Sequence, residues 1–384
     1  MSIIHSIRLA FRWTAIIALI ETIPCSMNAA SSSVDVYFGT YTRGVSKGIY
    51  RSTLDLKSGR LSDPELVGEA KDPDYLAIHP NKRFLYSVGG VDPGGGVTAW
   101  AIDPKNGSLN RLNQQSLGTA GPTHLVVDHT GRNVLVANYS GGSVACLPLN
   151  SDGSLRPVSS FTQHTGSSVN PNRQKEPHAH GIYIDPANRF VFVPDLGLDQ
   201  IKIYRLDPAH GTMKPNSIPF ASVAPGSGPR HFALDPKGHF GYVINEMLCT
   251  VTAFAYDSTA GGLKEFQTVS TLPQGMAVDR SYSTAEVFVH PNGKFLYGSN
   301  RGHDTIVVFA IGANGHLSWV ENKPAQVKTP RGFGIDPSGQ YLIAGGQVSD
   351  TASVFRIDQN TGRLQPTGQS VVVGAPVSVQ FLVK

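Results

Sequence analysis

The sequence predicts an all-β fold, a seven-bladed β-propeller with four antiparallel strands in each blade. Three observations lead to this prediction: a unit of roughly fifty residues repeats along the chain, a glycine mark recurs seven times, and one incomplete unit is divided between the two ends. The chain has 384 residues, of which 40% are hydrophobic and 16% charged. This composition supplies enough apolar side chains for a large folded core.

Each repeat unit begins with an apolar strand that ends in Asp or His, usually followed by Pro, before a tight turn. A second strand, a polar loop, a third strand and a Gly-x-Leu mark follow. The first turn is visible six times, at His79-Pro80, Asp128-His129, Asp185-Pro186, Asp235-Pro236, His290-Pro291 and Asp336-Pro337. The Gly-x-Leu-like mark is visible seven times, at Gly59/Leu61, Gly107/Leu109, Gly153/Leu155, Gly211/Met213, Gly261/Leu263, Gly315/Leu317 and Gly362/Leu364. The second count indicates seven units.

The segments between these marks have strand chemistry. Residues 123–127 are apolar enough to be buried on both faces, and residues 133–137 should pair with them across the tight turn. No long stretch after the first thirty residues keeps a helical period. Four antiparallel strands in each of seven units fit a β-propeller, which leaves only short, protected sheet edges.

The two ends of the chain complete each other. Residues 37–41 and 48–50 supply the outer part of a unit whose inner strand is missing at the N-terminus, and residues 377–381 can supply that strand. The last strand would then close the ring beside the first, so residues 31–384 are expected to form a single domain. An open β-solenoid is the alternative, but it does not account for the divided unit.

The first thirty residues differ from the rest of the chain. Arg8 and Arg12 precede the apolar stretch 13–20, and small residues follow before position 31. This is the order of regions in a secretory signal peptide. We therefore expect residues 1–30 to be a signal peptide and the mature protein to be periplasmic or secreted. An uncleaved leader, which would make the protein cytoplasmic, and a lipid anchor at Cys25 are the alternatives. No other segment is long and apolar enough to span a bilayer.

Charge and missing motifs narrow the function. The formal net charge is +4, which is too small and too dispersed to indicate a nucleic-acid footprint. A small molecule is the expected partner of a monomeric protein. Cys146 and Cys249, the cysteines beyond the leader, form no disulfide framework. The sequence has no G-x-S-x-G elbow, P-loop or H-E-x-x-H motif, so no cofactor is expected.

The repeat also predicts where chemistry should gather. In a two-stranded hairpin the start of the first strand and the end of the second lie at one edge, so both positions should face one mouth of the channel in every blade. The first position is occupied in turn by Asp74, Thr123, His180, Arg230, Ala285 and Arg331. The second is occupied by Gly89, Asn138, Asp195, Glu246, Asn300 with Arg301, and Gly346. Charged and titratable groups are therefore expected at one end of the ring.

Four of these residues are the candidate catalytic groups. His180 can pass a proton near neutral pH when a carboxylate fixes its tautomer, and Glu246 can activate water or hold His180. Arg230 and Arg301 offer planar forks suited to a carboxylate, a phosphate or the oxyanion of an attacked lactone. The alternatives are hydrogen bonds from His180 to loop backbone and a structural ion pair between Glu246 and Arg230.

A second set consists of candidate substrate-binding residues, each of which could equally cap a turn or hold a loop. This set contains His178, Asp195, His231, Asn138, Asn300 and Arg331. If residues 178 and 180 lie in a strand, their imidazoles project to the same side. No further ligands accompany this His-x-His pair, so we predict no metal site. His124 repeats the position of His231 and is expected to be structural.

The chain resembles the seven-bladed propeller lactonases, a family that includes the bacterial 6-phosphogluconolactonase and the fungal carboxy-cis,cis-muconate lactonising enzyme. The resemblance is carried by residues 38–42 (FGTYT), 47–50 (KGIY), 177–180 (PHAH), 194–197 (PDLG), 228–231 (GPRH), 245–246 (NE) and 299–302 (SNRG). It implies a propeller fold, activity on a lactone, and site residues at His180, Arg230, Glu246 and Arg301.

Together these observations predict a hydrolase that opens a small anionic lactone, 6-phosphogluconolactonase-like, at the mouth of the channel. Arg230 and Arg301 would bind the acid group or the oxyanion, while His180 and Glu246 move the proton. The alternatives are a muconate-type lactonising cycloisomerase, which runs such a ring opening in reverse, and a non-catalytic propeller that binds a ligand or protein. Which lactone is used stays open, because an exported protein would not meet a cytosolic sugar phosphate.

Overall fold

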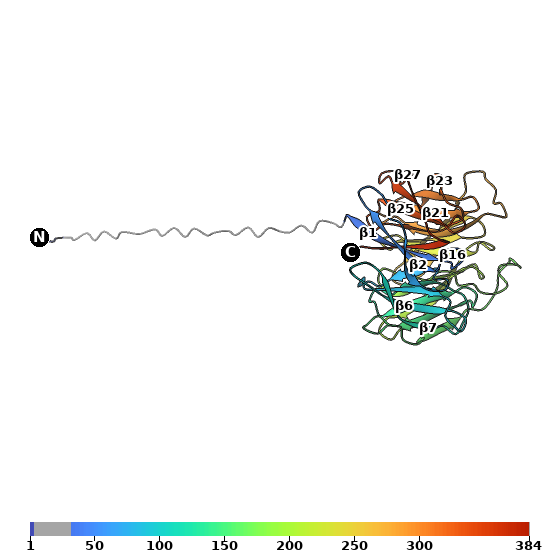
Figure 1. Ribbon diagram of the computed structural model, residues 1–384, viewed down its shortest axis with the longest axis horizontal. Coiled ribbons are helices and arrows are strands. Elements are labelled where there is room, and N and C mark those ends of the chain that lie inside the picture. The colour runs from blue at the N-terminus through green and yellow to red at the C-terminus, as the bar shows by residue number, and fades with distance from the viewer. Residues whose placement is uncertain (4–31, 384) are drawn as a thin grey trace. The chain divides into compact units, whose positions relative to one another are not determined.

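Seven four-stranded antiparallel sheets account for the described part of the chain (Figure 1). The computed structural model describes residues 1–3 and 32–383, and the predicted signal peptide lies almost wholly outside them. Residues 32–383 contain 28 strands. Nowhere in the described residues does a helix occur that is long and apolar enough to cross a membrane. The predicted seven-bladed propeller with four strands in each blade is confirmed.

The first two blades, each given from its inner strand outwards, are β28 (Pro376–Leu382), β1 (Ser33–Thr40), β2 (Gly48–Asp55) and β3 (Glu65–Glu69), and then β4 (Leu76–Ile78), β5 (Phe84–Gly89), β6 (Gly96–Ile102) and β7 (Leu109–Ser116). The next two are β8 (Pro122–Val127), β9 (Asn133–Asn138), β10 (Ser143–Pro148) and β11 (Ser160–Gln163), and β12 (Tyr183–Ile184), β13 (Phe190–Asp195), β14 (Gln200–Asp207) and β15 (Thr212–Ser222).

The fifth and sixth blades are β16 (Pro229–Leu234), β17 (Phe240–Asn245), β18 (Thr250–Asp257) and β19 (Gly262–Ser270), and β20 (Ser283–Val289), β21 (Phe295–Arg301), β22 (Thr305–Ile311) and β23 (Leu317–Pro324). The seventh is β24 (Pro330–Ile335), β25 (Tyr341–Gly346), β26 (Thr351–Ile357) and β27 (Leu364–Val372).

The Asp of the first turn holds the inner hairpin of a blade together. Asp128 Oδ1 accepts hydrogen bonds from the backbone N–H groups of Arg132 (2.8 Å) and Asn133 (2.7 Å), and Val127 pairs with Val134 across the turn. Asp185 accepts the equivalent pair of hydrogen bonds one blade further on. The repeated Asp is therefore a structural residue, because it satisfies two donors that the turn leaves unpaired.

The Gly-x-Leu mark joins neighbouring blades. Gly153 has a φ of +84°, and a Cβ placed on it would lie 2.5 Å from the Phe84 ring of the preceding blade. Its carbonyl accepts a hydrogen bond of 2.9 Å from the Tyr86 hydroxyl of that blade. Gly362 meets Phe295 and Tyr297 in the same way. Only glycine combines this backbone conformation with such close approach to a ring, which explains why the mark recurs.

The ring closes through the strand that the sequence assigned to it. β28 pairs with β1 in antiparallel register, with Val379 opposite Phe38 and Phe381 opposite Val36. The C-terminal end of the chain accordingly lies beside β1 in Figure 1. Val379 also packs in an apolar cluster with Tyr341 of β25. The first blade is thus completed by the last strand, which pairs with the edge that β1 would otherwise expose.

Candidate active site

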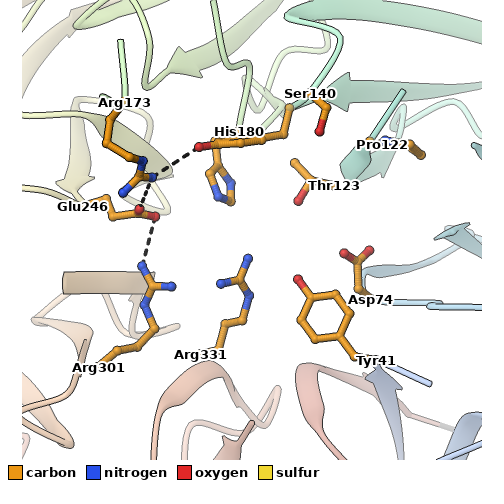
Figure 2. Close-up of a pocket in the computed structure, with 12 residues that line it drawn as sticks. Tyr41, Asp74, Pro122, Thr123, Ser140, Arg173, His180, Glu246, Arg301 and Arg331 are labelled. Atoms are coloured by element: carbon orange, nitrogen blue, oxygen red, sulfur yellow. Dashed lines mark hydrogen bonds and ion pairs between the residues drawn. The ribbon is translucent and has the colours of Figure 1, made fainter. Parts of the chain in front are cut away.

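A pocket of about 450 Å³ lies where the inner strands start and the second strands end. Residues from several blades contribute side chains to it, as Figure 2 shows. The pocket is lined by Tyr41, Asp74, Gly121, Pro122, Thr123, Tyr139, Ser140, Arg173, His180, Glu246, Arg301 and Arg331. A much smaller cavity of about 10 Å³ shares several of these residues and adds Arg230 and His231. Its size suits one water molecule.

β-Bulges direct several side chains toward these cavities. The register shifts between Pro122 and His124, between Pro229 and His231, and between Pro330 and Gly332. The extra residue in each bulge is Thr123, Arg230 or Arg331, and each lines one of the two cavities. A bulge breaks the strict alternation of a strand and re-aims one side chain. The preceding proline fits this position because it has no N–H to leave unpaired.

The connection between β11 and β12 forms one wall and is fastened by Asp195. Asp195 Oδ2 lies 2.6 Å from His164 Nδ1 at the start of the connection. Its Oδ1 accepts a hydrogen bond of 2.8 Å from the His178 backbone N–H near the end. This connection carries Arg173, and it ends with His180, whose N–H donates to the Pro194 carbonyl (2.9 Å). Asp195 therefore shapes the site without lining the pocket.

Glu246 is enclosed by three arginines. Arg173 Nη2 donates to Oε1 at 2.6 Å, Arg230 Nε donates to Oε2 at 3.0 Å, and Arg301 Nη2 lies 3.0 Å from Oε2. Arg301 Nη2 also donates to the Thr284 carbonyl at 2.7 Å. Burial alone would raise the pKa of Glu246, but the charges of Arg301, Arg230 and Arg173 hold it well below its usual range. Glu246 is therefore an ionised carboxylate that fixes guanidinium groups.

Arg230 lies beneath the pocket, where it borders the small cavity. Besides its contact with Glu246, its Nη1 donates to the Ala285 carbonyl at 2.7 Å. Burial, and then the charges of Arg331 and Arg301, lower its pKa to about 9. The group is thus still protonated at neutral pH, and the structural ion pair considered from the sequence is present.

His180 presents an imidazole to both cavities. Its Nδ1 is buried and has no hydrogen-bond partner among the described residues. Burial, together with the charges of Arg230, His231 and Arg331, holds its pKa well below 6.5. A neutral imidazole can accept a proton at physiological pH. No hydrogen bond joins it to Glu246, so the expected His180–Glu246 pair is not formed, because the arginines occupy both carboxylate oxygens.

Arg331 is the contrasting cation of the pocket. Its guanidinium lies 5.6 Å from the centre of the Tyr41 ring, and Figure 2 shows it below His180 with no ion pair to the other residues drawn. Within residues 32–383 it forms no salt bridge, although its charge lowers the pKa of Asp74. A guanidinium stacked on an aromatic ring is held in place while its donors stay available.

The other candidates from the sequence lie behind the pocket wall. His178 stacks on Tyr139 with ring centres 4.5 Å apart, and its Nδ1 lies 3.0 Å from the Tyr139 carbonyl. Asn138 donates to Ser143 Oγ, and Asn300 donates to the Thr271 carbonyl. These three residues and Asp195 hold backbone or neighbouring side chains, and none lines the pocket. The described residues contain no cluster of three or more His, Cys, Asp or Glu side chains arranged as metal ligands.

His231 belongs to a buried group under the pocket. Its Nδ1 lies 2.7 Å from Glu286 Oε1, and burial raises the pKa of Glu286 to about 8. The His231 ring packs edge-on against His180 and His124, at 5.2 Å in each case. His231 borders the small cavity rather than the main pocket.

Several pocket residues were absent from the sequence-based candidates. Asp74 and Thr123 occupy the predicted inner-strand position, so the repeat pointed to them, but their chemistry did not single them out. Tyr41 lies within the FGTYT segment. Arg173 comes from a connection that no other blade shares in this form, and no repeat or motif signalled it.

The sequence and the fold match known proteins along almost the whole chain. The family model "Lactonase, 7-bladed beta-propeller" matches residues 35–381. A 6-phosphogluconolactonase of Bacillus subtilis is 38% identical over 347 residues, covering 90% of this chain and 97% of the relative. One from Formosa agariphila is 33% identical over 353 residues, covering 90% and 99%.

A solved structure described as the periplasmic gluconolactonase of Pseudomonas aeruginosa superposes with a TM-score of 0.86 at 34% identity, covering 92% of this chain and all of that one. The fold and these matches thus define a propeller enzyme of the lactone-opening class. The chain belongs to the lactonase family of seven-bladed β-propellers.

Proposed function

We propose that this lactonase hydrolyses a six-carbon sugar lactone, with 6-phosphogluconolactone as the first substrate to test. The observation that carries the proposal is the neutral imidazole of His180, which borders both the main pocket and a cavity sized for one water. The relatives named 6-phosphogluconolactonase support the substrate class.

His180 and Arg331 have distinct tasks in the proposed reaction, and Glu246 takes no part in proton transfer. His180 accepts a proton from the attacking water as the water oxygen bonds to the lactone carbonyl carbon. The unpaired guanidinium of Arg331 faces the same space and stabilises the oxyanion that forms on the carbonyl oxygen. Glu246 takes no proton, because its low pKa and its three arginine partners keep it ionised.

The wall around Glu246 is the proposed phosphate site. Three guanidinium groups surround one carboxylate, so the cluster keeps a net charge of +2. Arg173 and Arg301 both line the pocket, and planar guanidinium groups suit phosphate oxygens. Arg230 lies deeper and acts by positioning Glu246 and by keeping His180 neutral.

The test is a substrate panel followed in a pH-stat, because lactone hydrolysis releases an acid. We expect kcat/KM for 6-phosphoglucono-lactone to exceed that for glucono-lactone by about 10- to 100-fold, the contribution of charge-assisted hydrogen bonds to the phosphate. Turnover of a muconate without lactone hydrolysis would instead support the cycloisomerase. A ligand that raises the melting temperature without any turnover would support a binding protein.

Unphosphorylated glucono-lactone is the second candidate substrate, and it is tied to location. The similarity to a protein named periplasmic gluconolactonase and the composition of residues 1–30 support an exported protein, which we propose is periplasmic. Mass spectrometry of the protein from its native host tests this: the mature chain should begin near residue 31. An intact Met1 in the cytosolic fraction would contradict export.

The proposed active unit is the monomer. The seven blades of the chain close a ring around the pocket, and this closure supports an active monomer. Size-exclusion chromatography with light scattering should give a single species close to the mass of one chain, and activity per chain should not change on dilution.

A further inference from the structure

Asp74 lies on the pocket wall opposite Glu246 and takes no part in the chemistry described so far. It lies two residues before β4, the inner strand of its blade, and lines both the main pocket and the small cavity. Figure 2 shows its carboxylate beside Tyr41, with Arg331 on the far side of the Tyr41 ring. Its Oδ1 is buried and has no hydrogen-bond partner among the described residues.

The surroundings of Asp74 favour its protonated form. Burial raises its pKa, the positive charge of Arg331 lowers it, the negative charge of Asp72 raises it, and the Tyr41 hydroxyl lowers it. The net result is a pKa of about 7. Asp72 is itself engaged, since its Oδ1 accepts hydrogen bonds from the Thr42 N–H and hydroxyl. The remaining ionisable side chains that line the small cavity are Tyr75, His180, Arg230 and His231.

Two titratable groups therefore line one pocket in opposite protonation states. His180 is held neutral and ready to accept a proton, while Asp74 retains one up to neutral pH. Environments that push two groups apart in this way are characteristic of an acid and base pair. Lactone opening needs both functions, because one proton leaves the water and another must reach the ring oxygen.

We propose that Asp74 is the catalytic acid that protonates the ring oxygen of the lactone as the bond from the carbonyl carbon to that oxygen breaks. This inference rests on the proposed lactone hydrolysis and adds to it the acid that protonates the leaving oxygen. The water oxygen bonds to the carbonyl carbon and its proton passes to His180. As the oxyanion reforms the carbonyl, the ring C–O bond breaks and the Asp74 proton moves to the leaving oxygen. The product acid then releases its proton, and His180 returns its own to Asp74 through solvent.

The pH profile gives the first test. An acid works in its protonated form, so wild-type kcat should fall as pH rises through about 7, after subtraction of spontaneous hydrolysis. Asp74→Asn should lower kcat by about 100-fold, the scale for loss of a general acid, and should abolish that decline. Asp92→Asn is the matched control: Asp92 is an exposed carboxylate in the adjoining pocket, and its loss should change neither feature.

A change of leaving group separates acid catalysis from a structural role. In the ring-sulfur analogue of the lactone the leaving group is a thiolate, which needs little protonation because thiols are much more acidic than alcohols. Asp74→Asn should therefore lose about 100-fold on the lactone and less than about 10-fold on the thiolactone. A residue that only holds the pocket in shape would lower both rates equally.

The possible outcomes distinguish this inference from the function on which it rests. If wild type and Asp92→Asn open no lactone, both proposals fall. If wild type opens lactones and Asp74→Asn loses equally on both substrates, or keeps the decline above pH 7, only the role of Asp74 falls. Should Asp74→Asn not fold, Asp74→Glu decides. Because this variant retains a carboxylic acid, its kcat must still decline above pH 7, and any loss of rate must be smaller on the thiolactone than on the lactone.

Discussion

The two walls of the pocket are built on opposite principles. On one wall Glu246 is joined to three arginines at 2.6–3.0 Å, and every charge there has a partner before a substrate arrives. On the other wall Asp74 and Arg331 have neither a salt bridge nor a hydrogen bond that joins them. The first wall is therefore a preformed scaffold, and the second holds groups that a bound substrate would complete.

This difference follows from the cost of burying charge. A buried carboxylate is tolerated when cations and hydrogen bonds compensate it, and the Glu246 cluster meets that condition. Asp74 is compensated only in part, by the charge of Arg331 and by Tyr41, and its pKa of about 7 leaves it near its protonation midpoint at neutral pH. Arg331 remains charged beside an aromatic ring instead of an acid. Substitution of the buried carboxylate on the first wall should accordingly affect stability, and substitutions on the second wall should affect turnover.

The largest expected effect is on stability, from Glu246→Gln. Removing this carboxylate leaves Arg230 and Arg301 buried without compensation, which should lower the free energy of unfolding by about 3 kcal/mol or more. Urea unfolding monitored by circular dichroism measures it. The effect must depend on pH: the folded-state pKa of Glu246 is depressed, so its stabilisation is present above the unfolded value of about 4.3 and is lost as pH falls below it.

Glu246→Gln and wild type should therefore approach each other in stability in acid. A variant as stable as wild type at pH 7 would show that the cluster is not a structural scaffold. Arg51→Met is a useful comparison, because Arg51 forms a 2.6 Å ion pair with Asp35 far from the pocket, and its loss should leave turnover unchanged.

We expect His180→Asn to lose turnover without losing stability. The Nδ1 atom of His180 has no protein partner to lose, so the melting temperature should stay within a few degrees. kcat should fall by about 100-fold because the base is missing. The acid decline of activity should lie well below pH 6.5, because the wild-type imidazole gains a proton only there, and in the variant this decline should disappear. Rates measured in a pH-stat from neutral pH down into the acid range check both expectations. An acid decline that persists in the variant would assign the base to another group.

We expect Arg331→Met likewise to lower turnover while leaving stability almost unchanged. Methionine keeps an apolar contact with Tyr41, and no acid is left unpaired, so stability should change by less than about 1 kcal/mol. Loss of an oxyanion donor lowers kcat by about 10²–10³. The loss should be the same for phosphorylated and unphosphorylated lactones, since the oxyanion is common to both. A defect confined to the phosphorylated substrate would instead place the phosphate at Arg331.

The fold was accessible from the sequence because its determinants are local and repeated. Asp128 acts within one hairpin, and Gly153 acts across one blade boundary. The same chemistry therefore recurs with every unit. The position of the site followed from the same repeat. Of the partners of Glu246, only Arg230 was considered from the sequence. The other contacts were not foreseen, because they join Glu246 to two further elements, and nothing in the sequence around Glu246 shows that both its oxygens are already engaged.

Arg173 and Asp74 show two further reasons why sequence reasoning stops short. Arg173 lies in a connection without a counterpart in the other blades, so no periodicity could align it with the site. Asp74 is aligned, but its position is shared by Thr123 and by Ala285. Its burial, which outweighs the opposing charge of Arg331, raises the pKa of its carboxyl to about 7. The environment, which the residue type does not encode, makes it a candidate acid.

The smallest effect, and the sharpest test of the scaffold wall, is expected from Arg173→Met. The Arg173 side chain is 42% exposed, so solvent screens its ion pair and stability should change by less than about 1 kcal/mol. Glu246 keeps its other two arginines. If this wall binds phosphate, kcat/KM for 6-phosphoglucono-lactone should fall by about 10-fold while that for glucono-lactone stays constant, because only the former uses the charge-assisted contact. Equal losses on both substrates would mean that Arg173 shapes the pocket without selecting its ligand.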